Sequence, residues 1–223
     1  MNKIISSTLD DLKDFPYLLT RFNKQVDIPD DLDILVHPED FDSVVAKLVN
    51  NGYKSTSHDH ALGGRIPGAQ INLTKQGRIK IDLHKDFTWR CKKYIDLQTI
   101  WKNSQKNHVN PVWDAFLVMI NVIFEKTYFT DDDLDIFWPH KNTIFSNQEF
   151  IQTAKKYAWE VTFHGFKSWI DKLPETRSRL LFLPFKLVIF SYTEKFNFVS
   201  LLYYLFFKTR YVLNKKLPYA QNP

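Results

Sequence analysis

The stretch DLDILV, residues Asp31 to Val36, places two carboxylates one residue apart inside a run of aliphatic side chains. Such a run predicts a β-strand, and residues two apart on a strand project from the same face. Asp31 and Asp33 are therefore expected side by side, with Leu32, Ile34 and Val36 facing a core. Because two close carboxylates repel each other, the pair indicates either a solvated strand end or a bound cation.

A second strand carries a third acid. Residues 69–73 and 78–84 flank a short turn that ends at Gly77, which predicts a β-hairpin. The second arm alternates, with apolar side chains on one face and polar ones on the other, the polar set being Arg78, Lys80, Asp82 and His84. Three strand carboxylates that meet on one face suit divalent cations, which hold phosphate oxygens during an in-line displacement.

The remaining pattern predicts a mixed front half and a helical back half. We expect a short helix at 7–15, a strand at 17–22, a helix at 38–50 that stops at Asn51-Gly52, and a strand at 53–62. Strand patterns fade after about residue 90, and helices are expected at 112–128, after Thr130, and at 150–170, 180–192 and 196–213. The fold class is therefore α+β, with domains at 1–105 and 106–223.

Charge and cysteine content limit the partners. The chain has 223 residues and a net charge of +5, yet from Lys167 onward ten Lys and Arg face three Asp and Glu. The basic character therefore belongs to the C-terminal quarter. The single cysteine, Cys91, excludes an intrachain disulfide, and the N-terminus has no apolar signal-peptide run. A cytoplasmic location is expected.

The order of short motifs is similar to that of a known superfamily. DLDILV is followed by Pro38-Glu39-Asp40, a helix, Asn51-Gly52-Tyr53 and the strand Ile81-Asp82-Leu83-His84. This order resembles the DNA polymerase β-like nucleotidyltransferases, and within them the uncharacterised bacterial and archaeal nucleotidyltransferases. The resemblance covers about residues 15–90. It implies a nucleotidyltransferase-like mixed β-sheet with flanking helices, followed by a helical C-terminal region that shapes the acceptor pocket.

The resemblance also implies roles for particular residues. Asp31 and Asp33 would hold Mg²⁺ or Mn²⁺, and Asp82 would be the third metal ligand or the base. Thr20 and Arg21 would lie near the donor phosphates. Lys80 and His84 are expected to contact the nucleotide because they share the polar strand face with Asp82. The implied reaction moves a nucleoside monophosphate from an NTP, with ATP as the expected donor, to a hydroxyl group. The acceptor stays open between a small molecule, a glycan precursor, a protein and an RNA end.

One position departs from the superfamily. Its members usually carry Gly-Ser about a dozen residues before the first Asp, where small residues let backbone N–H groups approach the triphosphate. Here Leu19 and Thr20 stand in that place. The Cβ of Leu19 is expected to hinder that approach. The alternative function is therefore a catalytically impaired nucleotidyltransferase fold that acts as a binding or membrane-surface-associated protein.

Two other chemistries fit the sequence less well. A zinc site built from His58, Asp59, His60 and His84 lacks a nearby cysteine that would complete a tetrahedral set. A metal-dependent nuclease would need an acid and a lysine on one strand face, whereas Asp82 and Lys85 are three residues apart and project oppositely.

The Phe-rich tail allows two interpretations. Its apolar segments, 180–192 and 196–207, are shorter than the roughly 20 residues that span a bilayer. They are expected either to pack as core helices or to attach residues 179–223 to an anionic membrane surface. In the second case the cations would be Lys208, Arg210, Lys215 and Lys216, and the protein would lie at the inner membrane surface.

Overall fold

The computed structural model describes residues 3–22, 29–55, 69–89, 92–173 and 181–194. In this part of the chain the main sheet contains β1 (Tyr17–Thr20), β2 (Asp31–Val36), β3 (Lys54–Ser55), β4 (Gln70–Thr74), β5 (Lys80–His84), β8 (Ser104–Gln105) and β9 (His108–Val109). The spatial order is β3-β4-β5-β2-β1-β9-β8. Strand β2 pairs antiparallel with β1 and parallel with β5. The sheet is therefore mixed, as the sequence predicts.

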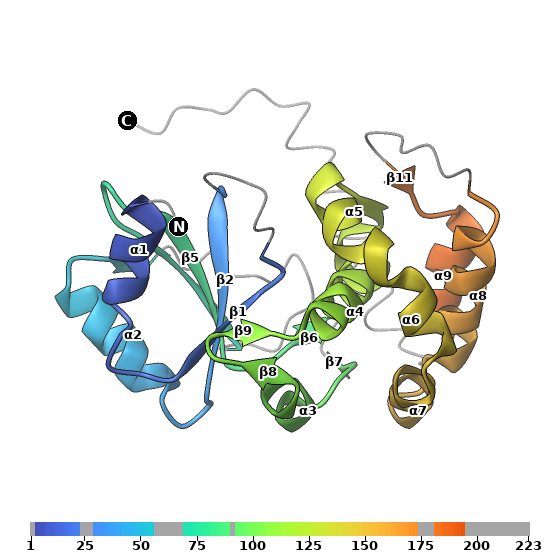
Figure 1. The fold of residues 1–223 in the computed structure, drawn as a ribbon, viewed down its shortest axis with the longest axis horizontal. Coiled ribbons are helices and arrows are strands. Elements are labelled where there is room, and N and C mark those ends of the chain that lie inside the picture. The colour runs from blue at the N-terminus through green and yellow to red at the C-terminus, as the bar shows by residue number, and fades with distance from the viewer. Residues whose placement is uncertain (1–2, 23–28, 56–68, 90–91, 174–180, 195–223) are drawn as a thin grey trace.

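Helices cover both sides of this sheet (Figure 1). They are α1 (Lys3–Asp10), α2 (Phe41–Asn50), α3 (Leu97–Lys102), α4 (Pro111–Asn121), α5 (Asp131–Phe137), α6 (Lys141–Ser146), α7 (Gln148–Lys156), α8 (Glu160–Ile170) and α9 (Phe185–Thr193). A π-helical turn, η2 (Val122–Lys126), continues α4, and a 3₁₀ turn, η3 (Trp138–His140), follows α5. Helices α1 and α2 lie on one side and α4 to α9 on the other. The class is α+β with a helical C-terminal part, which confirms the predicted fold class.

The alternation of β2 separates two hydrophobic cores. Leu32 and Ile34 are buried with residues of α1 and α2, whereas Leu35 is buried with residues of α4 and the helices behind it. Because side chains alternate along a strand, Asp31 and Asp33 share the face of Leu35. The acids therefore face the helical region.

Helix α4 is the centre of the second core. Nearly every residue from Trp113 to Asn121 is buried, because α4 packs between the sheet and the outer helices. Aromatic contacts continue outward from it, as between Phe116 and Trp159 and between Phe137 and Phe166. Many of the buried Phe and Trp side chains of the described back half belong to this core.

Several predicted helix boundaries are confirmed. Helix α2 ends at Asn50 and is closed by Gly52, which adopts φ +90° while the N–H of Tyr53 bonds to the carbonyl of Leu48. Thr130 begins α5 with a capping box, in which its hydroxyl accepts from the N–H of Asp133 and its own N–H donates to the Asp133 carboxylate.

Three predicted helices have different limits. The first helix is not 7–15 but Lys3–Asp10, and Thr8 lies inside it and donates its hydroxyl to the carbonyl of Ile4. The predicted helix 150–170 is two helices, because Ala158 adopts a left-handed φ of 54° and the N–H of Trp159 closes α7 on the carbonyl of Ala154. The predicted helix 180–192 begins only at Phe185, after Pro184, because proline lacks the N–H that a helix interior needs.

Strands also continue beyond residue 90, contrary to the sequence prediction. Besides β8 and β9, two small sheets pair β6 (Thr88–Trp89) with β7 (Lys92–Lys93) and β10 (Tyr128–Phe129) with β11 (Leu181–Phe182). Strands of two residues are too short to show alternation. The main sheet extends past residue 105, and the division at that residue stays a prediction.

Parts of other predictions lie outside the described residues, namely the strand 53–62 beyond Ser55, the helix 196–213, His58 to His60, and Cys91. No helix in the described ranges is both long and apolar enough to cross a membrane.

Candidate functional site

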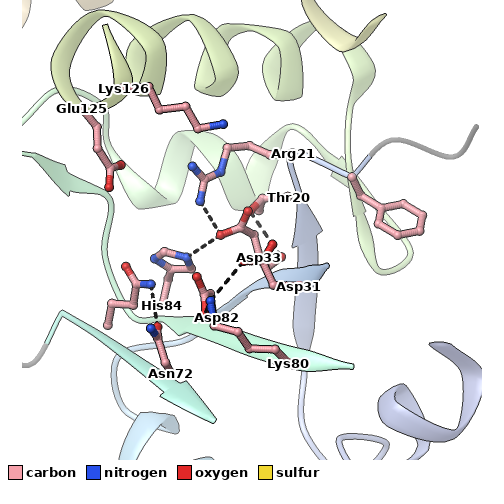
Figure 2. A network of polar contacts seen from close by, with 12 residues as sticks. Thr20, Arg21, Asp31, Asp33, Asn72, Lys80, Asp82, His84, Glu125 and Lys126 are labelled. Atoms are coloured by element: carbon pink, nitrogen blue, oxygen red, sulfur yellow. Dashed lines mark hydrogen bonds and ion pairs between the residues drawn. The ribbon is translucent and has the colours of Figure 1, made fainter. Parts of the chain in front are cut away.

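The register of β2 against β5 brings the three acids together. In this parallel pair Asp31 is opposite Lys80, and Asp33 is opposite Asp82. Directly opposed residues of neighbouring strands share one face and lie about 5 Å apart. The sequence predicted that the three acids share a face, and the register brings them together (Figure 2).

Asp33 is held by a guanidinium group and an imidazole ring. Its Oδ1 accepts from the Nη2 of Arg21 and lies 3.0 Å from the Nε2 of His84. Burial works against the charge of Arg21, but the neighbouring Asp33 carboxylate, followed by Glu125 and Asp133, raises its pKa above the ordinary value. Arg21 therefore stays charged at the acidic face.

Lys80 lies between the other two acids. Its Nζ is 3.2 Å from Asp31 Oδ2 and 2.9 Å from Asp82 Oδ1. Burial opposes its charge, but the neighbouring Asp82 carboxylate, together with Asp31, raises the pKa of Lys80. The ammonium group occupies the position between carboxylates that a metal ion would require.

Asp82 is a largely buried acid with a raised pKa. Its side chain is 15% exposed, and burial, with the charge of Asp33, raises its pKa to about 6. Its buried Oδ1 meets Lys80 as an ion pair at an angle that does not form a hydrogen bond. A buried carboxylate oxygen without a hydrogen bond, beside a second carboxylate, has the donor chemistry that a hard divalent cation prefers.

Metal entry would require rearrangement. Among the residues that the structure describes, no three His, Cys, Asp or Glu side chains are grouped as a metal centre. The oxygen donors fit Mg²⁺ or Mn²⁺ chemically, but Lys80 and Arg21 lie on the acids that would bind the ion. Asp31, whose side chain is 39% exposed, is the acid most open to solvent.

Leu19 does not lie on the acidic face. It is 2% exposed and packs with Leu32 and Ile34 in the core beneath α1 and α2. The expectation that its Cβ hinders phosphate approach is therefore wrong, because strand alternation points Leu19 into the opposite layer. Thr20 instead shares the face of Asp33, its register partner, and its hydroxyl is 3.4 Å from the backbone oxygen of that residue.

The two other polar residues predicted for this strand face, His84 and Arg78, lie in different places. His84 is buried against Phe87 and contacts Asp33, so it belongs to the site. Arg78, which precedes the strand, reaches Asp11 instead, with Nε 3.4 Å from Asp11 Oδ2. Arg78 is thus held on the side of α1 and does not take part in the acidic cluster.

The helical region adds residues that sequence reasoning missed. Glu125 and Lys126 come from the π-helical turn η2, and they lie near Arg21 on the side away from the strands β2 and β5 (Figure 2). Glu125 accepts from the indole N–H of Trp89 at 2.6 Å, and Lys126 bonds to both oxygens of Asp133 at 3.0 Å. Single π-turns often occur at functional sites, but nothing in the sequence distinguishes one from ordinary helix.

Asp114 is a third residue that the sequence did not identify. It is 8% exposed and lies in the first turn of α4. Its Oδ1 accepts from the backbone N–H of Arg21, and its Oδ2 accepts from that of Phe22 at 3.2 Å. Burial raises the pKa of Asp114 to about 7, although both backbone hydrogen bonds act in the opposite direction.

The mixed α+β fold, with its acidic face on β2 and β5, is consistent with a nucleotidyltransferase-like fold. Residues 28–117 match a family described as uncharacterised nucleotidyltransferases, which supports a nucleotidyltransferase assignment for this part of the chain. The matched range contains all three acids, Lys80, His84 and Asp114, but begins after Thr20 and Arg21. No curated protein and no solved structure matches the chain.

Proposed function

We propose that this protein is a metal-dependent nucleotidyltransferase that moves a nucleoside monophosphate from an NTP, with ATP as the expected donor, to a hydroxyl acceptor. The observation that carries the proposal is the register pairing of Asp33 with Asp82 beside Asp31. The similarity of residues 28–117 to uncharacterised nucleotidyltransferases supports the same reaction class.

In this proposal the acids have separate roles. Asp31 and Asp33 hold Mg²⁺ or Mn²⁺, which would neutralise phosphate charge and orient the donor. Asp82 is a third ligand or takes the proton of the acceptor hydroxyl, and a pKa of about 6 leaves it mostly ionised at neutral pH. The acceptor oxygen forms a bond to the α-phosphorus, and the bond to pyrophosphate breaks.

Basic and hydroxyl side chains would hold the donor. Arg21 and Lys80 already sit on the acidic face and can exchange a carboxylate for a phosphate oxygen. Thr20 and His84 complete this set through contacts with Asp33. Positioning and charge neutralisation account for most of the catalysis expected here, without a covalent intermediate on the protein.

The test is transfer from each α-³²P-labelled NTP with Mg²⁺ or Mn²⁺ to candidate acceptors, namely metabolite and glycan-precursor pools, proteins and RNA. The variant Asp31→Ala/Asp33→Ala is expected to lose at least about a hundredfold in rate. Asp42→Ala, an exposed acid on α2, is the control that should keep full activity. A wild-type protein that binds no NTP in either metal favours the alternative of a non-catalytic binding protein.

A membrane-surface role is a second proposal with its own observation. Phe182, Phe185 and Ile189 on β11 and α9 are exposed by 62%, 79% and 43%. The basic C-terminal quarter would add attraction to anionic lipid. In flotation with phosphatidylserine vesicles, Phe185→Ser/Ile189→Ser should reduce binding several-fold, whereas Val161→Ser on α8 should not. Full-length protein that stays unbound at low salt would exclude this role.

A further inference from the structure

The path of the chain after β1 depends on a carboxyl group from α4. Asp114 lies 93 residues from Arg21 in sequence, yet its two oxygens accept the consecutive backbone N–H groups of Arg21 and Phe22. The start of α4 is itself fixed, because the Asn110 side chain caps it by accepting from the N–H of Val112 at 3.0 Å. Asp114 is therefore a buried anchor on a well-defined helix end.

The conformation that this anchor holds is unfavourable on its own. Arg21 has a φ of 53°, in the left-handed region that costs a non-glycine residue on the order of 1 kcal/mol. Two buried N–H groups without an acceptor would add to that cost. Because Asp114 satisfies both groups, it stabilises the left-handed turn.

The turn determines where the guanidinium of Arg21 points. From this backbone its Nη2 reaches Asp33, while its Nε is buried with no hydrogen-bond partner (Figure 2). A different φ at Arg21 would carry the side chain away from β2. The contact of Arg21 with Asp33 therefore depends on Asp114, although Asp114 lies on another element.

We propose that Asp114 is a positioning residue, whose carboxyl group fixes the left-handed turn at Arg21 and so presents the guanidinium to Asp33 and to the donor phosphates. The part of this inference that concerns the donor phosphates rests on the proposed function. The N–H groups that follow β1 are already used by Asp114. The donor phosphates are accordingly bound by the side chain of Arg21 instead of by these N–H groups.

The first experiment needs no activity. Hydrogen exchange of the Arg21 and Phe22 amides and the NMR signal of the Arg21 Nε–H are measured in wild type, Asp114→Asn and Asp114→Ala. Exchange of the two amides is expected to accelerate at least tenfold in Asp114→Ala and less in Asp114→Asn, which keeps one acceptor. The slowly exchanging Nε–H signal should be lost in Asp114→Ala.

A matched control separates positioning from general destabilisation. Asp11 is also a largely buried carboxylate with several partners, namely Asn51, Tyr53, Lys75 and Arg78, all away from the acidic face. Asp11→Asn should lower stability while leaving the Arg21 signals unchanged. Unchanged exchange and an intact Nε–H signal in Asp114→Asn and Asp114→Ala would overturn the proposal.

The second experiment tests whether Asp114 acts through the Arg21 side chain. Dissociation constants for ATP with Mn²⁺ are measured for Asp114→Asn, Arg21→Ala and the double variant. Arg21→Ala removes the guanidinium but keeps the backbone N–H that Asp114 accepts. Each single change is expected to weaken ATP binding about tenfold. Because both changes act through the same guanidinium, the double variant should bind ATP no more weakly than Arg21→Ala alone. Additive losses would show that Asp114 acts independently of the guanidinium.

The two experiments also separate this inference from the proposed function. Wild-type protein that binds no ATP contradicts nucleotidyl transfer, and the exchange and Nε–H measurements then decide the role of Asp114 alone. ATP binding that is insensitive to both Asp114 and Arg21 leaves the reaction class intact and overturns the positioning role.

Discussion

Asp33 and Asp82 are directly opposed on the parallel strands β2 and β5, on the face turned toward the helical region. Each carboxylate is mostly buried, with exposed side-chain fractions of 17% and 15%. Repulsion between them is offset by Arg21 and Lys80. The acidic face is thus balanced by the chain's own cations.

Removing one of the opposed acids should stabilise the metal-free protein. In EDTA at pH 8, Asp82→Asn is expected to raise the free energy of unfolding by about 1–2 kcal/mol, because burial and Asp33 disfavour the Asp82 carboxylate. The same variant should lose Mn²⁺ binding and at least about a hundredfold in transfer rate. Urea unfolding and Mn²⁺ titration measure the two effects. A loss of stability in EDTA would contradict the electrostatic argument.

Lys80 should compete with a metal ion. Its Nζ lies between Asp31 and Asp82, so Lys80→Met is expected to tighten Mn²⁺ binding about tenfold, measured by electron paramagnetic resonance of free Mn²⁺. Lys85→Met is the control, because Lys85 lies over the ring of Phe41, on α2. Weaker Mn²⁺ binding in Lys80→Met than in wild type would mean that Lys80 supports the metal site.

Restoring the superfamily's glycine should damage this protein. Leu19 is buried in the core under α1 and α2, so Leu19→Gly is expected to lower the free energy of unfolding by about 3–5 kcal/mol through the cavity it leaves. Val49→Ala, at a half-exposed position of α2, should cost well under 1 kcal/mol. Tighter ATP binding in a well-folded Leu19→Gly protein would show that the Leu19 side chain does hinder the approach of the phosphates.

The titration of Asp114 should appear in the pH dependence of stability. Burial raises its folded-state pKa to about 7, above the unfolded value near 4, so the folded protein holds a proton that the unfolded chain releases. From pH 4 to 7 the stability of wild type should therefore fall relative to Asp114→Asn, by at most about 1.4 kcal/mol per pH unit. Above pH 7 the difference should level off. If the free energy of unfolding of wild type instead rose relative to Asp114→Asn with increasing pH, the pKa of Asp114 would be lowered in the folded protein.

The sequence predicts the parts of the fold that depend on local pattern. Alternation in residues 31–36 and 78–84 identifies β2 and β5 and assigns the acids to a polar face, and Gly52 identifies the end of α2. The parallel pairing that sets Asp33 opposite Asp82 was not predicted. No local signal fixes that register.

The missed features depend on contacts between distant segments. Ala158 ends α7 in a conformation that usually requires glycine, and the burial of Trp159 stabilises that break. Asp114 is one acid within an apolar helix, and its partners are the backbone groups of residues 21 and 22, which no side-chain pattern can indicate. Leu19 was misjudged because similarity to a motif was given more weight than strand alternation.

The cations on the acidic face also bear on the order in which ligands arrive. Three bare carboxylates would repel a polyanionic nucleotide until a metal had bound. Arg21 and Lys80 reduce the repulsion between these acids and an approaching triphosphate. In the proposed function, a donor would therefore enter together with its own bound cation.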